Sequence, residues 1–214
     1  MVSLIEYAQI ARAVYKPAND DDAHVFGFGN PPGFTIEDRS VFEGGSFWSS
    51  GLQMRAYRKY SGGDVVIAFK GTRPVQASDL LADLKLVLEM IPKQAYEAIK
   101  HTTDWTGQLK APRVTLVGHS LGGGIAQVVG ITGDIRFVTF NAPGMWTNTV
   151  GLCAFKKLKN TTKAGVNWIK WGDAVGNFGK HIGDTQRVRS TGHGIQEFID
   201  FLKFHPARDK DPLA

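Results

Sequence analysis

The chain has 214 residues, 43% of them hydrophobic and 21% charged, with a formal net charge of +5. This length allows one domain with a substantial core, so we expect residues 1–214 to form a single domain. The positive charge is modest for this length, and no base-stacking or groove-reading motif accompanies it, which argues against a nucleic-acid partner. A single cysteine, Cys153, excludes an internal disulfide, and no apolar run reaches the length that spans a bilayer.

The first residues predict a helix and no secretory signal. The start of the chain lacks the basic segment, the long apolar stretch and the small-residue cleavage site of a signal peptide. Ser3 followed by Glu6 is instead typical of a capping box that opens a helix. The apolar face of this helix would carry Leu4, Ala8, Ala11 and Tyr15. We therefore expect a cytoplasmic protein, or one exported by a signal-independent secretion system.

Strand and helix patterns alternate along the rest of the chain. Residues 18–33 are rich in Asn, Asp, Gly and Pro, which indicates a surface loop, and two edge-strand patterns follow near 34–38 and 52–60. The central strands are more apolar and lie at 65–69, 114–117, 137–140 and 166–171. Helical patterns occupy 93–109, after Pro92, and 121–130. This order predicts an α/β protein with a mainly parallel central sheet and helices on both faces.

One segment, Gly118-His119-Ser120-Leu121-Gly122, follows a predicted strand and opens a predicted helix. This is the G-x-S-x-G nucleophile elbow in the context that it requires. The serine of such an elbow sits on a strained turn, and side chains two residues before or after it would collide, so glycine is needed there. The following helix points its free amides at the site, so the N–H of Leu121 would contribute to an oxyanion hole. We predict Ser120 as the nucleophile; the alternative is a Gly-rich turn with an incidental serine.

A serine nucleophile needs a base, and the base needs an orienting carboxylate. In this fold the acid follows the nucleophile in the chain and lies at the carboxyl end of a strand. Asp134 precedes its predicted strand and would lie at the wrong end of the sheet. Asp173 comes directly after the strand at 166–171 and is correctly placed, with Asp184 as the alternative.

Three histidines lie far enough downstream to serve as the base. His193 stands in a glycine-flanked loop before an amphipathic helix, so a base on that loop could reach Ser120 while the helix docks on the sheet. His181 is the alternative. His205 follows the last helix in a polar tail, where solvation explains it.

Several segments together resemble the class 3 lipases, the fungal-lipase-like branch of the α/β-hydrolases. The similar segments lie, in the family's order, at 65–72, 79–86, 114–124, 137–144, 172–183 and 193–202. The resemblance implies a triad of Ser120, Asp173 and His193, and a non-catalytic His181. It also implies that Thr72 completes the oxyanion hole with Leu121, although an ordinary strand-end turn would explain this threonine as well.

The chain departs from the family pattern in places. Lys70 stands where the family usually has arginine, and the Val-His-x-Gly-Phe segment before the elbow is missing. The small size and the Phe-Asn-Ala-Pro-Gly form at 140–144 are similar to bacterial lipase-like proteins, including some delivered as antibacterial phospholipase effectors. That resemblance implies an immunity-type protein as a partner.

The function predicted from these features is hydrolysis of lipid esters, either glycerides or phospholipids, through an acyl-enzyme. The apolar stretch at 80–92 would form a lid or acyl-pocket wall, or simply pack in the core, and the segment at 145–165 would cap the site. Basic residues near the site would suit transient contact with a membrane surface. The alternatives are a short-chain esterase or thioesterase, and an inactive hydrolase-fold binding protein. No cofactor or metal site is expected, because the histidines lack ligand spacing.

Overall fold

The computed structural model describes residues 1–15, 30–43, 50–71, 84–147, 165–190 and 192–213. They build a seven-stranded sheet in which the strands lie side by side in the order of the sequence. The strands are β1 (Phe34–Glu43), β2 (Gln53–Lys59), β3 (Val65–Phe69), β4 (Val114–His119), β5 (Phe137–Phe140), β6 (Gly165–Lys170) and β7 (Asp184–Val188). The first three strands pair antiparallel and all later neighbours pair parallel, which confirms the mainly parallel sheet.

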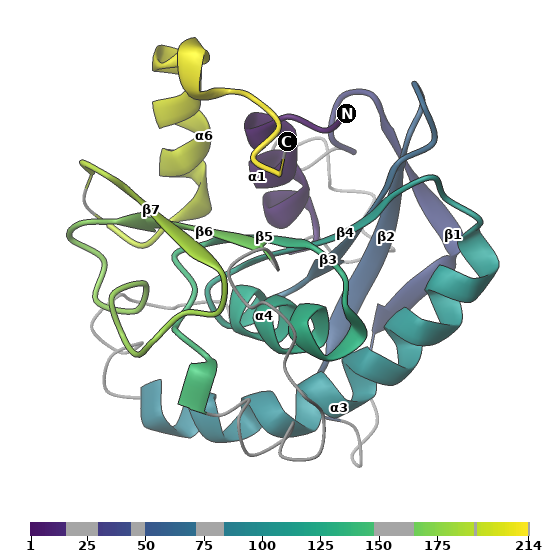
Figure 1. Ribbon diagram of the computed structural model, residues 1–214, viewed down its shortest axis with the longest axis horizontal. Coiled ribbons are helices and arrows are strands. Elements are labelled where there is room, and N and C mark those ends of the chain that lie inside the picture. Colours follow the sequence, from purple (N-terminus) through teal and green to yellow (C-terminus); the bar gives the residue numbers. More distant parts are fainter. Residues whose placement is uncertain (16–29, 44–49, 72–83, 148–164, 191, 214) are drawn as a thin grey trace.

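Helices cover both faces of this sheet, as predicted (Figure 1). Helices α3 (Leu84–Leu109) and α4 (Leu121–Gly133) lie on one face, and α1 (Leu4–Ala13) and α6 (Ile195–Phe204) lie on the other. A short 3-10 helix, Pro206–Arg208, follows α6. No helix among the described residues is both long and apolar enough to cross a membrane.

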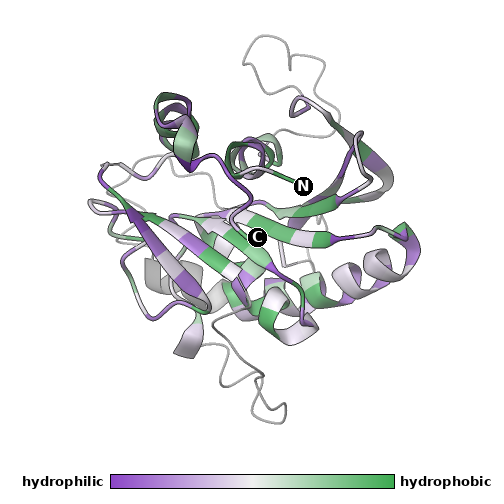
Figure 2. Ribbon diagram, turned by 45° about the horizontal axis from the view of Figure 1, so that its top comes forward, coloured by the Kyte–Doolittle hydropathy of each residue, from purple (hydrophilic) through white to green (hydrophobic). Residues whose placement is uncertain are grey.

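The core has two halves because the central strands are buried on both sides. In β3, Val66 and Ala68 join the cluster under α1 and α6, while Val65, Ile67 and Phe69 join the cluster under α3 and α4. All five side chains are at most 1% exposed. This two-sided burial explains why β3 is a continuous apolar run instead of an alternating one. Figure 2 shows the same hydrophobic band through the middle of the sheet.

The structure differs from the sequence prediction at one helix and one strand. The helix expected at 93–109 begins at Leu84 and continues through Pro92, although a proline inside a helix costs about 3 kcal/mol. Ile91, Ala95 and Ala98 are fully buried against the sheet side of α3, and this packing stabilises the helix across the proline. Strand β7 was not predicted, because four of its five residues are polar and it lies at the edge of the sheet.

Two segments that the sequence singled out, 80–92 and 145–165, lie partly outside the described residues. In the apolar stretch at 80–92, residues 84–92 belong to α3, and the side chain of Ile91 is buried in the core, as plain packing requires. Residues 80–83, residues 148–164 of the predicted cap, Cys153 and most of the 18–33 loop lie outside the described ranges.

Helix α1 is fixed at both ends. The capping box predicted for Ser3 and Glu6 is present, with the Ser3 amide donating to Glu6 Oε2 at 2.7 Å. The carboxylate of Asp209 accepts from the amide of Ile5 at 2.8 Å, so the chain end returns to the start of the helix. At its other end α1 is followed by Tyr15, which reaches the site described next.

Candidate active site

Ser120 lies on a sharp turn between β4 and α4. Its backbone torsion angles are φ 57° and ψ −132°, which non-glycine residues rarely adopt and which cost of order 1–3 kcal/mol. The neighbouring glycines are required, because a Cβ atom at Gly118 would lie 2.3 Å from the backbone of Gly122, and one at Gly122 would lie 2.1 Å from the carbonyl oxygen of Phe69. The strand, the strained serine and the close backbones together form a nucleophile elbow.

Helix α4 starts immediately after the serine. The Ser120 carbonyl accepts from the amides of Gly123 and Gly124, at 3.0 and 3.2 Å. Leu121 is the first residue of the helix, a position whose N–H has no acceptor within the helix. Thr72 lies outside the described residues. Gly71 just before it packs closely on the elbow, because a Cβ atom there would lie 2.6 Å from the His119 carbonyl oxygen.

Asp173 follows β6 and is 3% exposed. Its Oδ1 atom accepts from the amides of Val175 and Gly176 at 2.8 and 3.1 Å, which holds the carboxylate in one orientation. Its Oδ2 atom lies 2.7 Å from Nδ1 of His193. The acid and the base predicted from the sequence are therefore in direct contact.

His193 presents its second ring nitrogen as a free acceptor. With Nδ1–H donating to Asp173, the neutral ring carries its lone pair on Nε2. Nε2 is buried and has no hydrogen-bond partner within the described part of the chain. The ring centroid lies 4.8 Å from that of His119, the residue before Ser120. A buried imidazole nitrogen without a partner is unusual, and beside an elbow serine it has the chemistry of a general base.

The alternative acids and bases lie elsewhere. Asp184 is exposed and pairs with Val166 at the amino end of the parallel strands, away from Ser120. His181 binds the Gly176 carbonyl through Nε2 at 2.8 Å, and burial lowers its pKa. His205 is exposed and binds the carbonyl of Phe201. His181 Nδ1 is also buried without a partner in the described structure, but the other nitrogen of this ring binds a backbone carbonyl, whereas that of His193 binds the Asp173 carboxylate. This difference favours His193 as the base.

The loop that carries His193 is held by side chains that the sequence reasoning missed. The His193 carbonyl lies 2.7 Å from Nε2 of His119 and 3.0 Å from Nδ2 of Asn141. Nζ of Lys170 donates to the Gly194 carbonyl at 2.9 Å. The three side chains come from the carboxyl ends of β4, β5 and β6, which are neighbours in the sheet. The sequence offered one signal for these three side chains, which is their position at or just after the end of a parallel strand.

Lys170 is a charged group inside the protein, with a side chain that is 0% exposed. Burial lowers its pKa, and its hydrogen bond to Glu197 opposes that shift. The ammonium group also lies 4.9 Å from the ring centroid of Phe198. These contacts keep the buried lysine partnered and tie the start of α6 to β6.

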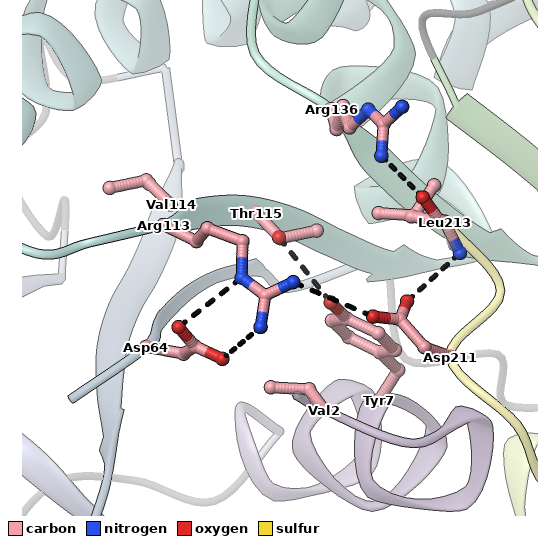
Figure 3. A pocket seen from close by; sticks show the side chains of 9 residues that line it. All are labelled: Val2, Tyr7, Asp64, Arg113, Val114, Thr115, Arg136, Asp211 and Leu213. Carbon is pink, nitrogen blue, oxygen red and sulfur yellow. Dashed lines mark hydrogen bonds and ion pairs between the residues drawn. The ribbon is translucent and has the colours of Figure 1, made fainter. Parts of the chain in front are cut away.

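A small pocket lined by charged and polar side chains lies at the amino ends of the parallel strands, at the opposite end of the strands from Ser120 (Figure 3). Arg113 donates to Asp64 at 2.9 Å and lies 3.7 Å from Asp211, so its charge is paired twice. The hydroxyl of Tyr7 donates to Thr115 at 3.3 Å. This pocket adjoins the amino ends of β3 and β4, far from the elbow. Within the described ranges, no group of three or more His, Cys, Asp or Glu side chains is arranged to hold a metal ion.

Comparison with known proteins places the chain in a family. Residues 6–195 match the phospholipase-like family described as the Tle-like phospholipase domain. A search of curated proteins finds no significant match.

Solved fungal lipases share the fold at low sequence identity. The lipase from Rhizopus microsporus var. chinensis superimposes with a TM-score of 0.57 and 14% identity, over 88% of this chain and 74% of that one. Lip2 lipase from Yarrowia lipolytica gives 0.56 and 14%, over 86% and 77%. The Rhizomucor miehei lipase in its propeptide complex gives 0.54 and 14%, over 86% and 67%. The protein has the α/β-hydrolase fold, and because the family match spans most of its length, it belongs to the Tle-like phospholipase domain family.

Proposed function

We propose that this enzyme hydrolyses carboxylic esters of lipids, with Ser120 as nucleophile, His193 as general base and Asp173 as the carboxylate that orients the base. The observation that carries the proposal is the state of His193. Its Nδ1 atom is bound to buried Asp173 at 2.7 Å, while its Nε2 atom is buried and without a partner in the described structure. Such an imidazole is ready to accept the proton of a serine hydroxyl.

The reaction follows from these roles. His193 Nε2 takes the proton from the Ser120 hydroxyl as Oγ attacks the ester carbonyl, and Asp173 stabilises the imidazolium that forms. The N–H of Leu121 at the start of α4 binds the oxyanion. Thr72, which lies outside the described residues, is our proposal for the second donor. The tetrahedral intermediate collapses, and the alcohol leaves with the proton that His193 returns. Water, deprotonated by the same imidazole, then attacks the acyl-enzyme and releases the fatty acid.

Aromatic and basic side chains near Asp173 support a phospholipid substrate presented at a membrane surface. Trp171, two residues before Asp173, is 63% exposed, and Phe178 in the same loop is 45% exposed. The Arg187 guanidinium lies 5.8 Å from the Trp171 ring centroid, and Lys180 Nζ lies 4.6 Å from that of Trp146. Exposed aromatic rings favour the lipid–water interface, and adjacent cations favour anionic headgroups. We therefore propose transient membrane contact through this loop.

The test is the rate of hydrolysis by the wild type and by Ser120→Ala over p-nitrophenyl esters from acetate to palmitate, and over phospholipid vesicles with and without anionic lipid. We expect Ser120→Ala to lower kcat by about 10⁶-fold. Rates should rise with acyl length and with anionic lipid. A preference for acetate would assign a short-chain esterase instead. Absence of any serine-dependent rate would identify an inactive scaffold and contradict the proposal.

A further inference from the structure

We propose that Tyr15 and His119 are positioning residues, linked by hydrogen bonds, that join the oxyanion side of the site to the loop that carries the base. This inference rests on the proposed roles of Ser120 and His193. Neither side chain needs to touch the substrate. Their role is to hold two segments that are distant in the sequence, the residues just after β3 and the loop before α6, at a fixed distance from the nucleophile.

The link begins at His193. Its backbone carbonyl lies 2.7 Å from Nε2 of His119, and a carbonyl oxygen only accepts hydrogen bonds. Nε2 of His119 must therefore carry the proton. A neutral ring protonated at Nε2 has its lone pair on Nδ1, so that atom needs a donor.

Tyr15, in the turn after α1 and more than a hundred residues away in the sequence, supplies that donor. Its hydroxyl oxygen lies 3.1 Å from Nδ1 of His119 and 3.4 Å from the His119 carbonyl oxygen. The same oxygen accepts a hydrogen bond from the backbone of Gly71, the residue before Thr72. A Cβ atom at Gly71 would lie only 2.5 Å from this oxygen, so glycine is required for the contact.

The hydrogen bonds of this link run in one direction when the Tyr15 O–H donates to its nearer acceptor, His119 Nδ1 at 3.1 Å, and not to the His119 carbonyl oxygen at 3.4 Å. The Gly71 N–H donates to the Tyr15 oxygen, the Tyr15 O–H donates to His119 Nδ1, and His119 Nε2–H donates to the His193 carbonyl. Such a one-way arrangement holds its members in single orientations. It holds Gly71 and the loop carrying His193 on the same rigid frame.

The neutral state of His119 matters for the chemistry beside it. Burial and, secondly, the neighbouring His193 lower the pKa of His119 to about 3. Its ring centroid lies 4.8 Å from that of His193, which becomes positively charged during the reaction. A neutral His119 positions the base without repelling that charge.

The test uses a matched pair of tyrosines, Tyr7 within α1 and Tyr15 in the turn that follows it. Tyr15→Phe removes the hydroxyl of the link, and Tyr7→Phe removes a hydroxyl that binds Thr115 at the far edge of the sheet. We expect Tyr15→Phe to lower kcat on a soluble ester about tenfold with an unchanged KM, since small misplacements of catalytic groups carry costs of this order. Tyr7→Phe should change thermal stability but leave kcat unchanged.

Variants of His119 separate positioning from folding. His119→Gln keeps an N–H donor for the His193 carbonyl, whereas His119→Leu removes it, so we expect His119→Gln to retain several-fold more kcat at equal folded fraction. Equal kcat for Tyr15→Phe and Tyr7→Phe, or for the two His119 variants, would overturn the positioning role while wild-type Ser120-dependent activity stands. A wild type without that activity would overturn the proposed function and this role together.

A readout without catalysis tests the geometry itself. Nitrogen-15 NMR of the histidine rings in Ser120→Ala should report His119 as neutral and protonated at Nε2 at pH values about two units below an ordinary histidine pKa. In Tyr15→Phe this signal should move, and in Tyr7→Phe it should not. Protonation at Nδ1, or no response to loss of the Tyr15 hydroxyl, would refute the link whatever the activity.

Discussion

The amino ends and the carboxyl ends of the parallel strands (the amino edge and the carboxyl edge) both carry paired polar side chains, yet they differ in one respect. At the amino edge, Asp64 and Arg113 carry opposite charges that satisfy each other. At the carboxyl edge, Lys170 is likewise paired with Glu197. Asp173 binds only one nitrogen of His193, and the other nitrogen, Nε2, has no partner among the described residues. A satisfied ion pair anchors structure, whereas a buried polar atom kept free beside a strained serine is what catalysis requires.

Helix α1 and the turn after it contribute one tyrosine to each edge. Tyr7 binds Thr115 beside the ion pairs, and burial raises its pKa to about 12. Tyr15, in the turn after α1, binds His119 at the elbow. The same kind of side chain thus lines a structural pocket at the start of α1 and supports the candidate active site just beyond its end. Tyr7 and Tyr15 have the same side chain, and the difference between their roles comes from where each one lies.

Among substitutions at the carboxyl edge that keep Ser120, His193 and the fold intact, we expect Asp173→Asn to lower kcat the most. The amide has the shape of the carboxylate but stabilises the wrong tautomer of His193, so kcat should fall about 10⁴-fold. Because Val175 and Gly176 still have an acceptor at Oδ1, thermal unfolding should change little. Steady-state kinetics and calorimetry on the same preparation measure both. A loss of less than tenfold would mean that Asp173 does not orient the base.

The pH dependence of stability should come in part from His119. The folded protein holds this imidazole neutral with a pKa near 3, against about 6.5 in the unfolded chain. Between these values only the unfolded state takes up the proton, so the free energy of unfolding falls as pH falls, by at most about 1.4 kcal/mol per pH unit. His119→Gln should flatten this acid limb in urea titrations. Identical slopes for the wild type and the variant would show that burial does not keep His119 neutral.

The smallest effect is expected at the amino edge. Asp64→Asn removes the charge that faces Arg113, and because the Arg113 side chain is 52% exposed, the loss should be only about 1 kcal/mol, or about 2–4 °C in Tm. Activity on a soluble ester should be unchanged, since this pair lies at the far end of the strands. A fall in kcat at a temperature where the variant is fully folded would contradict the separation of the two edges.

The sequence predicted those parts of the fold and site that follow from local patterns. The central strands are recognisable because burial on both faces requires continuous apolar runs such as 65–69. The elbow is recognisable because the backbone contacts at Gly118 and Gly122 exclude every side chain. The contact between Asp173 and His193 was predictable from chain order and from the gathering of loops at the carboxyl edge.

Features that depend on distant partners were not predictable. Strand β7 is polar because it lies at the sheet edge, so its sequence carries no strand pattern. The helix at 84–92 runs through Pro92 because core packing outweighs the cost of the proline. Three further contacts join segments that are far apart in the sequence, so no local spacing predicts them. They are those of Tyr15 with His119, of His119 with the His193 carbonyl, and of Lys170 with the Gly194 carbonyl.

The central claim is that Ser120 is a nucleophile activated by His193. The most direct measurement is the reaction of the folded protein with diethyl p-nitrophenyl phosphate, followed by p-nitrophenolate release and by mass spectrometry of the labelled peptide. We expect one equivalent of p-nitrophenolate per chain, with the diethylphosphoryl group on Ser120. We also expect a strongly reduced labelling rate in His193→Ala and no label in Ser120→Ala. Labelling of another residue, or hydrolysis of lipid esters that persists in Ser120→Ala, would contradict the central claim.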